Sequence, residues 1–186
     1  MNKKILENIF DDLFPLNRSI LGRDYRKSLD KLKGFVPFKY YDFKSGDKVF
    51  DWTIPKEWQI NDAYISKLNG EKIIDFKINN LHVLNYSSSV NKIISINELR
   101  KKIFTLKSQP NAIPYVTSYY KKNWGFCMSY NNFINLNEKK YRVKINSKFI
   151  DGKLRIGEAI LKGSSDKEIL ISSYLCHPSM ANNELS

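Results

Sequence analysis

The sequence has few cysteines, few histidines and no long apolar run. Its 186 residues contain two histidines and two cysteines, Cys127 and Cys176. Two cysteines are too few for a disulfide framework or a cysteine-based zinc site, so they predict reduced thiols in a reducing compartment. No run approaches the roughly 20 apolar residues that span a bilayer. Acidic residues also interrupt the apolar patch after Lys3 and Lys4, which argues against a signal peptide and predicts a cytoplasmic protein.

Arginine is also scarce, although the chain is strongly basic. The 31 lysines and arginines outnumber 19 acidic residues and give a formal charge of +12, yet only six of the 31 are arginines. Such a charge brings a nucleic-acid or anionic-surface partner into consideration. Phosphate recognition more often clusters arginines on one face, whereas these lysines are scattered in ones and twos. The pattern favours a solvated lysine-rich surface and predicts no nucleic-acid or membrane partner.

What the chain does contain is enough apolar material for one domain or two small ones. Its hydrophobic content is 42% and its aromatic content is 13%, which is typical of a globular protein. Near the N-terminus, Ile5, Ile9 and Leu13 recur at helical spacing and Pro15 follows, so a first amphipathic helix is predicted. A second short helix is predicted after Gly22.

Residues 37–136 have the character of β-structure. Short runs of aromatic and β-branched residues alternate with turn signals, and Asn69-Gly70 predicts a two-residue hairpin turn. One helix is expected within this section, because Ser95 and Glu98 have capping-box spacing and an apolar face follows as far as Leu106.

The last section, residues 137–186, contains two different apolar patterns. From Tyr141 to Phe149 apolar and polar residues alternate, which predicts a half-buried strand. From Glu168 to Leu175 the run lacks this alternation, which is typical of an interior strand in a sheet covered on both faces. We therefore expect residues 169–175 to be more buried than residues 141–149.

His177 stands directly after this second run, in the segment Cys176-His177-Pro178-Ser179. Ligands and metals gather at the carboxyl ends of strands in open α/β sheets, and a neutral imidazole there binds zinc readily. From spacing alone, a lone histidine is also compatible with a purely structural role.

Several segments resemble one family. The run from Cys176 to Ser186 is similar to the Cys-His-Pro-Ser … Asn-Asp-x-Leu-Ser-Gly stretch of a bacterial zinc-aminopeptidase-like family, which is found in polysaccharide-biosynthesis gene neighbourhoods and contains a domain of unknown function. Further resemblances cover nearly the whole chain: Arg18-Ser19-Ile20, Phe50 to Trp58, Leu81-His82-Val83, Tyr86-Ser87, and Ser118-Tyr119-Tyr120 running to Cys127.

The resemblance implies the start of a zinc-aminopeptidase-like α/β sheet domain with an inserted β-rich module. Its N-terminal helices would be residues 1–36, the insertion residues 37–136, and the first strands with the metal-site turn residues 137–186. The family's catalytic and remaining ligand residues come from later segments. This implies that the chain is an N-terminal fragment that is inactive alone, whereas the intact protein would act on peptide or aminoacyl-type substrates.

The resemblance also suggests two zinc ligands. His177 would be one, and Asn183 takes the place of an aspartate that usually contacts the metals. An amide oxygen is a weaker donor and brings no negative charge to hold two close cations together. The catalytic and substrate-binding residues are not identified by the sequence.

Two other features have alternative interpretations. Trp52 and Trp58 could form a carbohydrate- or peptide-binding surface, although a role in the core is favoured. His82 lies in an apolar run and is interpreted as a buried or edge histidine outside the metal site. The alternative function is a non-catalytic sugar- or peptide-binding protein in polysaccharide biosynthesis. On that interpretation the family scaffold, with its weakened metal site, holds its ligand without cleaving it, since a fold does not fix an activity.

Overall fold

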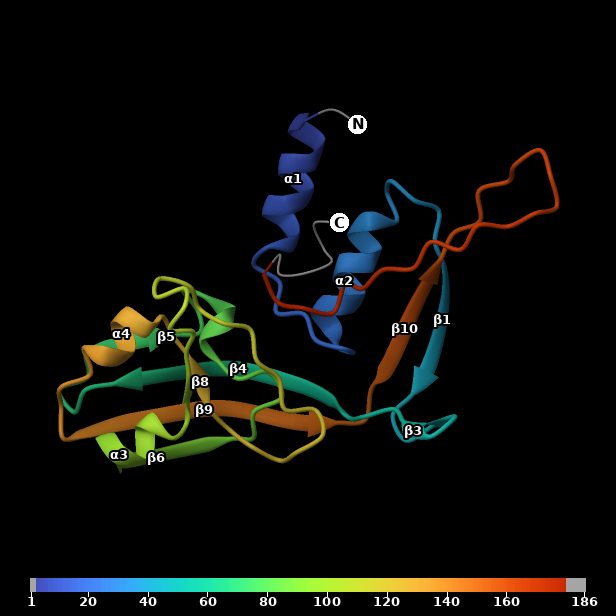
Figure 1. The fold of residues 1–186 in the computed structure, drawn as a ribbon. Coiled ribbons are helices and arrows are strands. Elements are labelled where there is room, and N and C mark those ends of the chain that lie inside the picture. The colour runs from blue at the N-terminus through green and yellow to red at the C-terminus, as the bar shows by residue number, and fades with distance from the viewer. Residues whose placement is uncertain (1–2, 180–186) are drawn as a thin grey trace. The chain divides into compact units, whose positions relative to one another are not determined.

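The chain folds as two compact units, seen in a computed structural model that describes residues 3–179 (Figure 1). The first unit contains residues 3–57 and 151–179 of the described chain, and the second is Trp58–Ile150. Helices and several β-sheets occur together, so the α/β class predicted from the sequence is confirmed. Within residues 3–179, no helix combines the length and apolar character that crossing a membrane would need.

The first unit begins with two helices. Helix α1 spans Lys3–Leu13 and ends two residues before Pro15, as the sequence predicts; the residue before a proline disfavours helical dihedrals. Helix α2 spans Arg23–Leu32 and starts after Gly22, whose φ of 152° suits a glycine. An ion pair of 2.8 Å between Lys31 and Asp12 connects the two helices.

The strands of the first unit are short. Strand β1, Lys39–Lys44, pairs antiparallel with β10, Lys153–Glu158, and the two lie side by side in Figure 1. Strands β2, Lys48–Val49, and β3, Trp52–Thr53, form a small antiparallel hairpin. A segment near the N-terminus is therefore paired with one that follows the second unit in the sequence.

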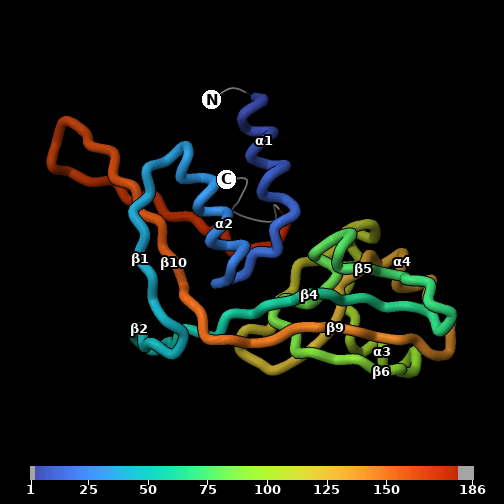
Figure 2. Tube along the Cα trace, turned by 180° about the vertical axis from the view of Figure 1, so that it is seen from behind, coloured from blue at the N-terminus to red at the C-terminus, as the bar shows by residue number. Residues whose placement is uncertain are grey.

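The second unit is built on a four-stranded sheet with the strand order β5-β4-β9-β6. The strands are β4, Glu57–Ser66; β5, Lys72–Asp75; β6, Val90–Ser95; and β9, Lys140–Ile150. Figure 2 shows β4, β9 and β6 running beside one another. The central strand β9 comes last in the sequence of this unit, so the sheet is completed by a non-local pairing.

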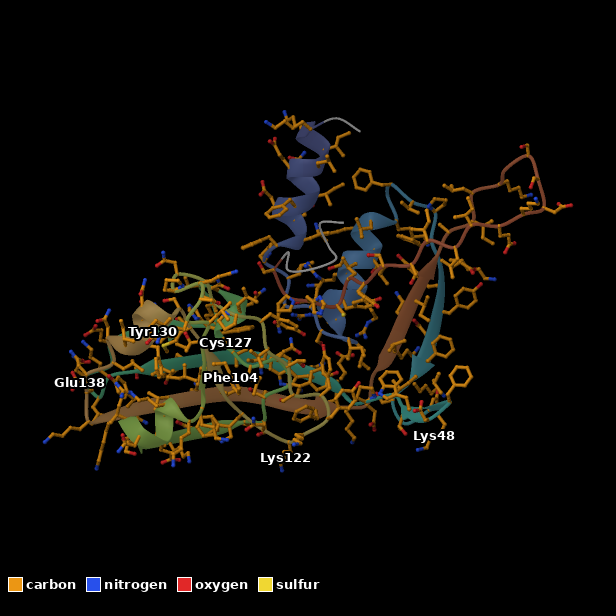
Figure 3. The ribbon with its side chains drawn as sticks, in the orientation of Figure 1. Lys48, Phe104, Lys122, Cys127, Tyr130 and Glu138 are labelled. Carbon is orange, nitrogen blue, oxygen red and sulfur yellow. The ribbon has the colours of Figure 1, made fainter. Side chains whose placement is uncertain are left out.

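Small elements surround this sheet. Strand β7, Ile103–Phe104, pairs in parallel with β8, Phe126–Cys127, and Figure 3 labels the adjacent Phe104 and Cys127. The remaining elements are the 3₁₀ helix η1, Asn80–His82, and the short helices α3, Ile96–Arg100, and α4, Tyr130–Ile134.

Helix α3 confirms the predicted cap but not the predicted length. The hydroxyl oxygen of Ser95 accepts a hydrogen bond of 3.2 Å from the backbone N–H of Glu98. The helix ends at Arg100, and Ile103 lies in a strand. Ile103 continues the helical spacing of apolar residues, but it is buried because its strand pairs with Phe126. The spacing therefore predicts a longer helix than the one that forms.

The Asn69-Gly70 hairpin forms between β4 and β5, with a longer loop than the sequence suggests. The two strands pair from Ser66 and Lys72 onward, and the backbone N–H of Lys67 donates to the carbonyl of Glu71. Of the two turn residues, only Gly70 has a positive φ, at 95°. A hairpin of this length needs one left-handed residue rather than two.

Strand β9 supplies much of the core of the second unit. Tyr141, Val143 and Ile145 are at most 1% exposed, whereas Arg142 is exposed between them. This is the alternation that the sequence predicts, and it holds as far as Ile145, whereas Phe149 is 39% exposed. The core is completed by other fully buried side chains, among them Ile65, Leu84, Leu99, Phe126 and Met128.

The compact units have different bounds from the module predicted at residues 37–136. Residues 39–44 form β1, which pairs with β10 of the first unit, and residues 140–150 form the central strand of the second. Strand pairing between distant segments decides where these bounds fall, and local composition does not reveal it. The assignment of the units to a peptidase-like domain and an insertion stays a prediction.

The predicted interior strand at residues 168–175 is wrong. This segment has no regular secondary structure, and Ile169, Leu170 and Ile171 are 91%, 91% and 89% exposed. It is more exposed than residues 141–149, the reverse of the expectation. An apolar run becomes an interior strand only where neighbouring strands pair with both its edges, and no strand among residues 3–179 pairs with this segment.

This contrast can be tested with matched substitutions. We expect Ile145→Ala to lower the free energy of unfolding by about 2–5 kcal/mol, because it leaves a cavity in the core. Ile169→Ala, at an exposed site, should change it by less than about 0.5 kcal/mol. Urea unfolding followed by circular dichroism measures both. Equal losses would show that residues 168–175 are buried after all.

Candidate functional site

Arg18 lies at the centre of the best-defined polar arrangement in the first unit. It stands in the loop between α1 and α2, and its residue is 0% exposed. Its guanidinium donates hydrogen bonds to three backbone carbonyl oxygens, those of Leu13, His177 and Ser179; the bond from Nε to the His177 carbonyl is 2.9 Å. A buried charge is costly unless it is hydrogen-bonded, and the planar fork of an arginine suits several acceptors at once.

These bonds fix the segment that contains His177. Arg18 binds the carbonyls on both sides of Pro178, so the turn is held at two points. Ser179 has a φ of 57°, which is uncommon for a residue with a side chain. Such a backbone persists where surrounding contacts determine it, and the bond from Arg18 to the Ser179 carbonyl is one such contact.

The loop that contains Arg18 is itself well ordered by polar contacts. The hydroxyl of Ser19 donates to the carbonyl of Leu21 at 2.9 Å, and the backbone N–H of Asn17 donates to the carboxylate of Asp24 at 3.2 Å. Leu21 is 0% exposed. The guanidinium is therefore presented from a loop that is anchored to the start of α2.

His177 is half-buried, with Cys176 directly before it and the buried Pro178 directly after it. Cys176 and Cys127 are both free thiols. Burial raises the pKa of Tyr25, in α2, to about 12, and the charge of a Cys176 thiolate contributes in the same direction. The surroundings of Tyr25 therefore favour its neutral phenol.

The residues described here do not by themselves form a zinc site. Throughout residues 3–179, no group of three or more His, Cys, Asp or Glu side chains is arranged to hold a metal ion. The structure thus describes one of the two ligands suggested by the sequence, His177, while Asn183 lies outside the described residues. A catalytic zinc normally needs three protein ligands and an open position.

The other histidine, His82, is half-buried within the second unit. The ring nitrogen Nδ1 of His82 lies 2.9 Å from the carbonyl oxygen of Cys127, and burial lowers the pKa of His82. A neutral imidazole that is hydrogen-bonded to a backbone carbonyl stabilises the local fold. This agrees with the interpretation of His82 as a structural residue.

The tryptophans do not form an aromatic binding surface together. Trp58 is 4% exposed, stacks on Tyr86 with ring centroids 6.0 Å apart, and donates from Nε1 to the carbonyl of Ser87 at 2.8 Å. Trp52 is half-buried and belongs to the first unit. The core role favoured by the sequence is confirmed for Trp58.

Sequence reasoning did not assign a role to Arg18 or Glu57. Glu57 is 2% exposed and pairs with Arg26 at 2.9 Å. Arg18 belongs to a segment that resembles the family, but its hydrogen-bond partners lie up to 161 residues away. A signal was present in retrospect, since Arg18 is a single charge between apolar stretches, which is typical of a buried charge with fixed partners.

We expect Arg18→Met to disrupt the His177 turn, because three buried carbonyls would lose their donor. The free energy of unfolding should fall by about 3–5 kcal/mol, and hydrogen exchange of the Cys176, His177 and Ser179 amides should become faster. Arg23→Met is a matched control, since the Arg23 side chain is 73% exposed. Unchanged exchange in Arg18→Met would contradict this role.

The raised pKa of Tyr25 predicts an alkaline effect. In the unfolded chain a tyrosine ionises near its ordinary value of 10.0, whereas Tyr25 in the folded protein ionises at about 12. The unfolded state therefore gains stability relative to the folded state as pH rises from 10 to 12. Tyr25→Phe should lose less stability over this range than the unmodified chain does. Denaturant unfolding at pH 8, 10 and 11.5 measures the difference, and parallel losses would contradict the burial of this phenol.

Comparisons with known proteins give these features a context. Residues 57–148 match the family described as "Domain of unknown function (DUF2172)". Over 179 residues the chain is 48% identical to a Clostridium acetobutylicum protein, named as a candidate polysaccharide biosynthesis protein with an aminopeptidase-like domain; the match covers 96% of this chain and 41% of the relative.

The fold is also similar to that of a solved structure. The crystal structure of a candidate peptidase from Clostridium acetobutylicum matches with a TM-score of 0.88 and 46% sequence identity, over 96% of this chain and 42% of that chain. This chain therefore spans about two fifths of the length of the relatives that it matches.

Proposed function

We propose that this chain, whose residues 57–148 match the DUF2172 family, is part of a zinc-dependent aminopeptidase-like hydrolase. In this proposal His177 is one of the metal ligands. The observation that carries the proposal is the double hydrogen bond of Arg18 to the carbonyls of His177 and Ser179. A metal ligand must be held in a defined orientation by its surroundings. The buried Arg18 donates hydrogen bonds to the carbonyls on both sides of Pro178 and so constrains the backbone there.

The similarity to a candidate peptidase and to a protein with an aminopeptidase-like domain supports the reaction class. In such hydrolases a bound zinc polarises a carbonyl and activates water. The described residues of this chain contribute one imidazole, so we infer that further ligands come from beyond residues 3–179. Asn183 is our candidate for one of them, and its uncharged amide favours a single metal ion over a close pair.

The substrate class and the setting are part of the same proposal. We expect a peptide or an aminoacyl-type small molecule as substrate, and a role in polysaccharide biosynthesis in keeping with the name of the Clostridium relative. Cytoplasmic localisation is proposed from the two free thiols. A non-catalytic sugar- or peptide-binding role is the alternative; Trp58, which is 4% exposed, is not available to stack on such a ligand.

We expect the purified 186-residue chain to bind zinc weakly and to show no aminopeptidase activity above background, because its described residues contain no three-ligand cluster. His177→Ala should then change neither property. In the full-length Clostridium relative, replacing the residue at the position equivalent to His177 with alanine should abolish both zinc binding and turnover. Metal analysis after dialysis and hydrolysis of aminoacyl nitroanilides are the measurements.

Two outcomes would contradict the proposal. Stoichiometric zinc with turnover in the 186-residue chain, both lost in His177→Ala, would show that this chain assembles a complete site. Full activity and metal content in the relative with alanine at the position equivalent to His177 would show that this position does not supply a ligand.

A further inference from the structure

The positive charge of the chain is concentrated in the second unit. Of the 31 lysines and arginines, 15 lie in Trp58–Ile150, together with only five of the 19 acidic residues. This unit therefore carries +10 of the formal charge of +12, and the rest of the chain carries +2. Lysines that are scattered in the sequence are thus concentrated in one unit of the fold. Because like charges repel, this concentration of positive charge needs a physical explanation.

Ion pairs neutralise only part of this excess. Four of the five acidic residues pair with lysines: Asp62 with Lys144, Glu71 with Lys67, Asp75 with Lys72 and Glu98 with Lys92. Within residues 3–179, Lys140, Arg142 and Lys148 have no acidic partner. All three are exposed and all three lie on strand β9.

These three residues share one face of the sheet. Successive side chains of a strand point to opposite faces, and the odd-numbered Tyr141, Val143 and Ile145 are buried in the core. The even-numbered side chains of β9 therefore point outward, and they are Lys140, Arg142, Lys144, Asn146 and Lys148.

The neighbouring strand β6 continues this outward face. In the antiparallel register Ser95 lies opposite Lys140, Ile93 opposite Arg142, and Asn91 opposite Lys144. Ile93 is 47% exposed. The face thus combines positive charges with hydroxyl and amide groups and one apolar side chain, all on two adjacent strands.

The geometry suits an extended polymer more than a small molecule. Outward side chains recur every second residue, about 7 Å apart, and Lys140 and Lys148 are separated by about 27 Å along the strand. A row of positive charges of this length on one face of a sheet can contact successive charged groups of a linear polymer. Hydroxyl and amide side chains such as Ser95, Asn91 and Asn146 both donate and accept hydrogen bonds, as sugar hydroxyls require.

We propose that the outward face of β9 and β6 binds an acidic polysaccharide through Lys140, Arg142 and Lys148. Nucleic acid fits this face less well for two reasons. Sequence-tolerant binding of single strands uses exposed aromatic rings on which bases stack, but Tyr64 in β4 is covered by Lys72 and Lys144, at 4.9 and 5.6 Å from the ring centroid. The face also carries a single arginine. This surface is independent of the metal-site proposal, because all its residues lie in the second unit.

The test compares two triple variants of the whole chain. The face variant is Lys140→Gln, Arg142→Gln and Lys148→Gln. The matched control is Lys107→Gln, Lys121→Gln and Lys122→Gln, which removes three exposed charges from loops of the same unit; Lys122 lies in the loop before β8 (Figure 3). Circular dichroism melts establish that both variants fold like the unmodified chain.

Binding is measured by calorimetry at low and at high salt, with polygalacturonate as the acidic polysaccharide. Neutral dextran and single-stranded poly-dT serve as the other probes. We expect the unmodified chain to bind polygalacturonate, with affinity that falls as salt rises, and not to bind dextran. The face variant should bind about tenfold more weakly, since three exposed charge contacts are lost, whereas the control should change by less than about twofold.

Three results would overturn the proposal. Equal losses in the face variant and the control would show attraction by net charge alone, without a defined surface. Failure to bind polygalacturonate at low salt would exclude the proposed ligand class. Tighter binding of poly-dT than of polygalacturonate, lost in the face variant, would assign the surface to nucleic acid. Failure of the zinc or peptidase experiments would leave all three results unaffected.

Discussion

The first unit depends on a single buried guanidinium. Arg18 is removed from water, so its N–H groups need acceptors inside the protein. Carbonyls from the end of α1 and from the His177 turn supply them. The two segments are far apart in the sequence, and the charge is stabilised only when both are in place. This coupling gives the turn a defined backbone, including the left-handed Ser179, although the apolar segment before it has no regular structure.

An ion pair between Arg26 and the buried Glu57 lies where the chain leaves the first unit. Glu57, the last residue before the second unit, pairs with Arg26 of α2, and a Cβ at Gly152 would lie 2.5 Å from the Glu57 Cβ. Only a glycine permits this close approach. Ser45 adds hydrogen bonds to both the N–H and the carbonyl of Gly152. Glu57 and Gly152, which flank residues 58–150 in the sequence, thus lie close together within the first unit.

The sequence predicts the local elements well, because each depends on neighbouring residues. The spacing from Ile5 to Leu13, the cap at Ser95 and the alternation along β9 all appear in the structure. The sequence predicts less of what depends on distant partners. The apolar run at residues 168–175 was interpreted as a strand, but burial requires neighbours that residues 3–179 do not provide.

The candidate site shows the same division. His177 could be singled out from its position after an apolar run, and the family resemblance gave it a role. The contribution of Arg18 could not be deduced from composition, since it arises from hydrogen bonds across 159 and 161 residues. A metal site assembled from several segments is likewise invisible to local patterns. For that reason the ligand set remains a proposal, whereas the fixation of the His177 turn is a property of the structure.

Charge has two distinct roles in this chain, and burial separates them. The guanidinium of Arg18 donates hydrogen bonds to backbone carbonyls of the protein itself, so it stabilises the fold. Arg142 has the same chemistry on a solvent-facing position of β9, between side chains that build the core. Removing its charge leaves no buried acceptor unpaired, so folding places little constraint on it. A row of such unconstrained charges on one face, in a unit where four of the five carboxylates are already paired with lysines, is better explained by an external anion than by stability.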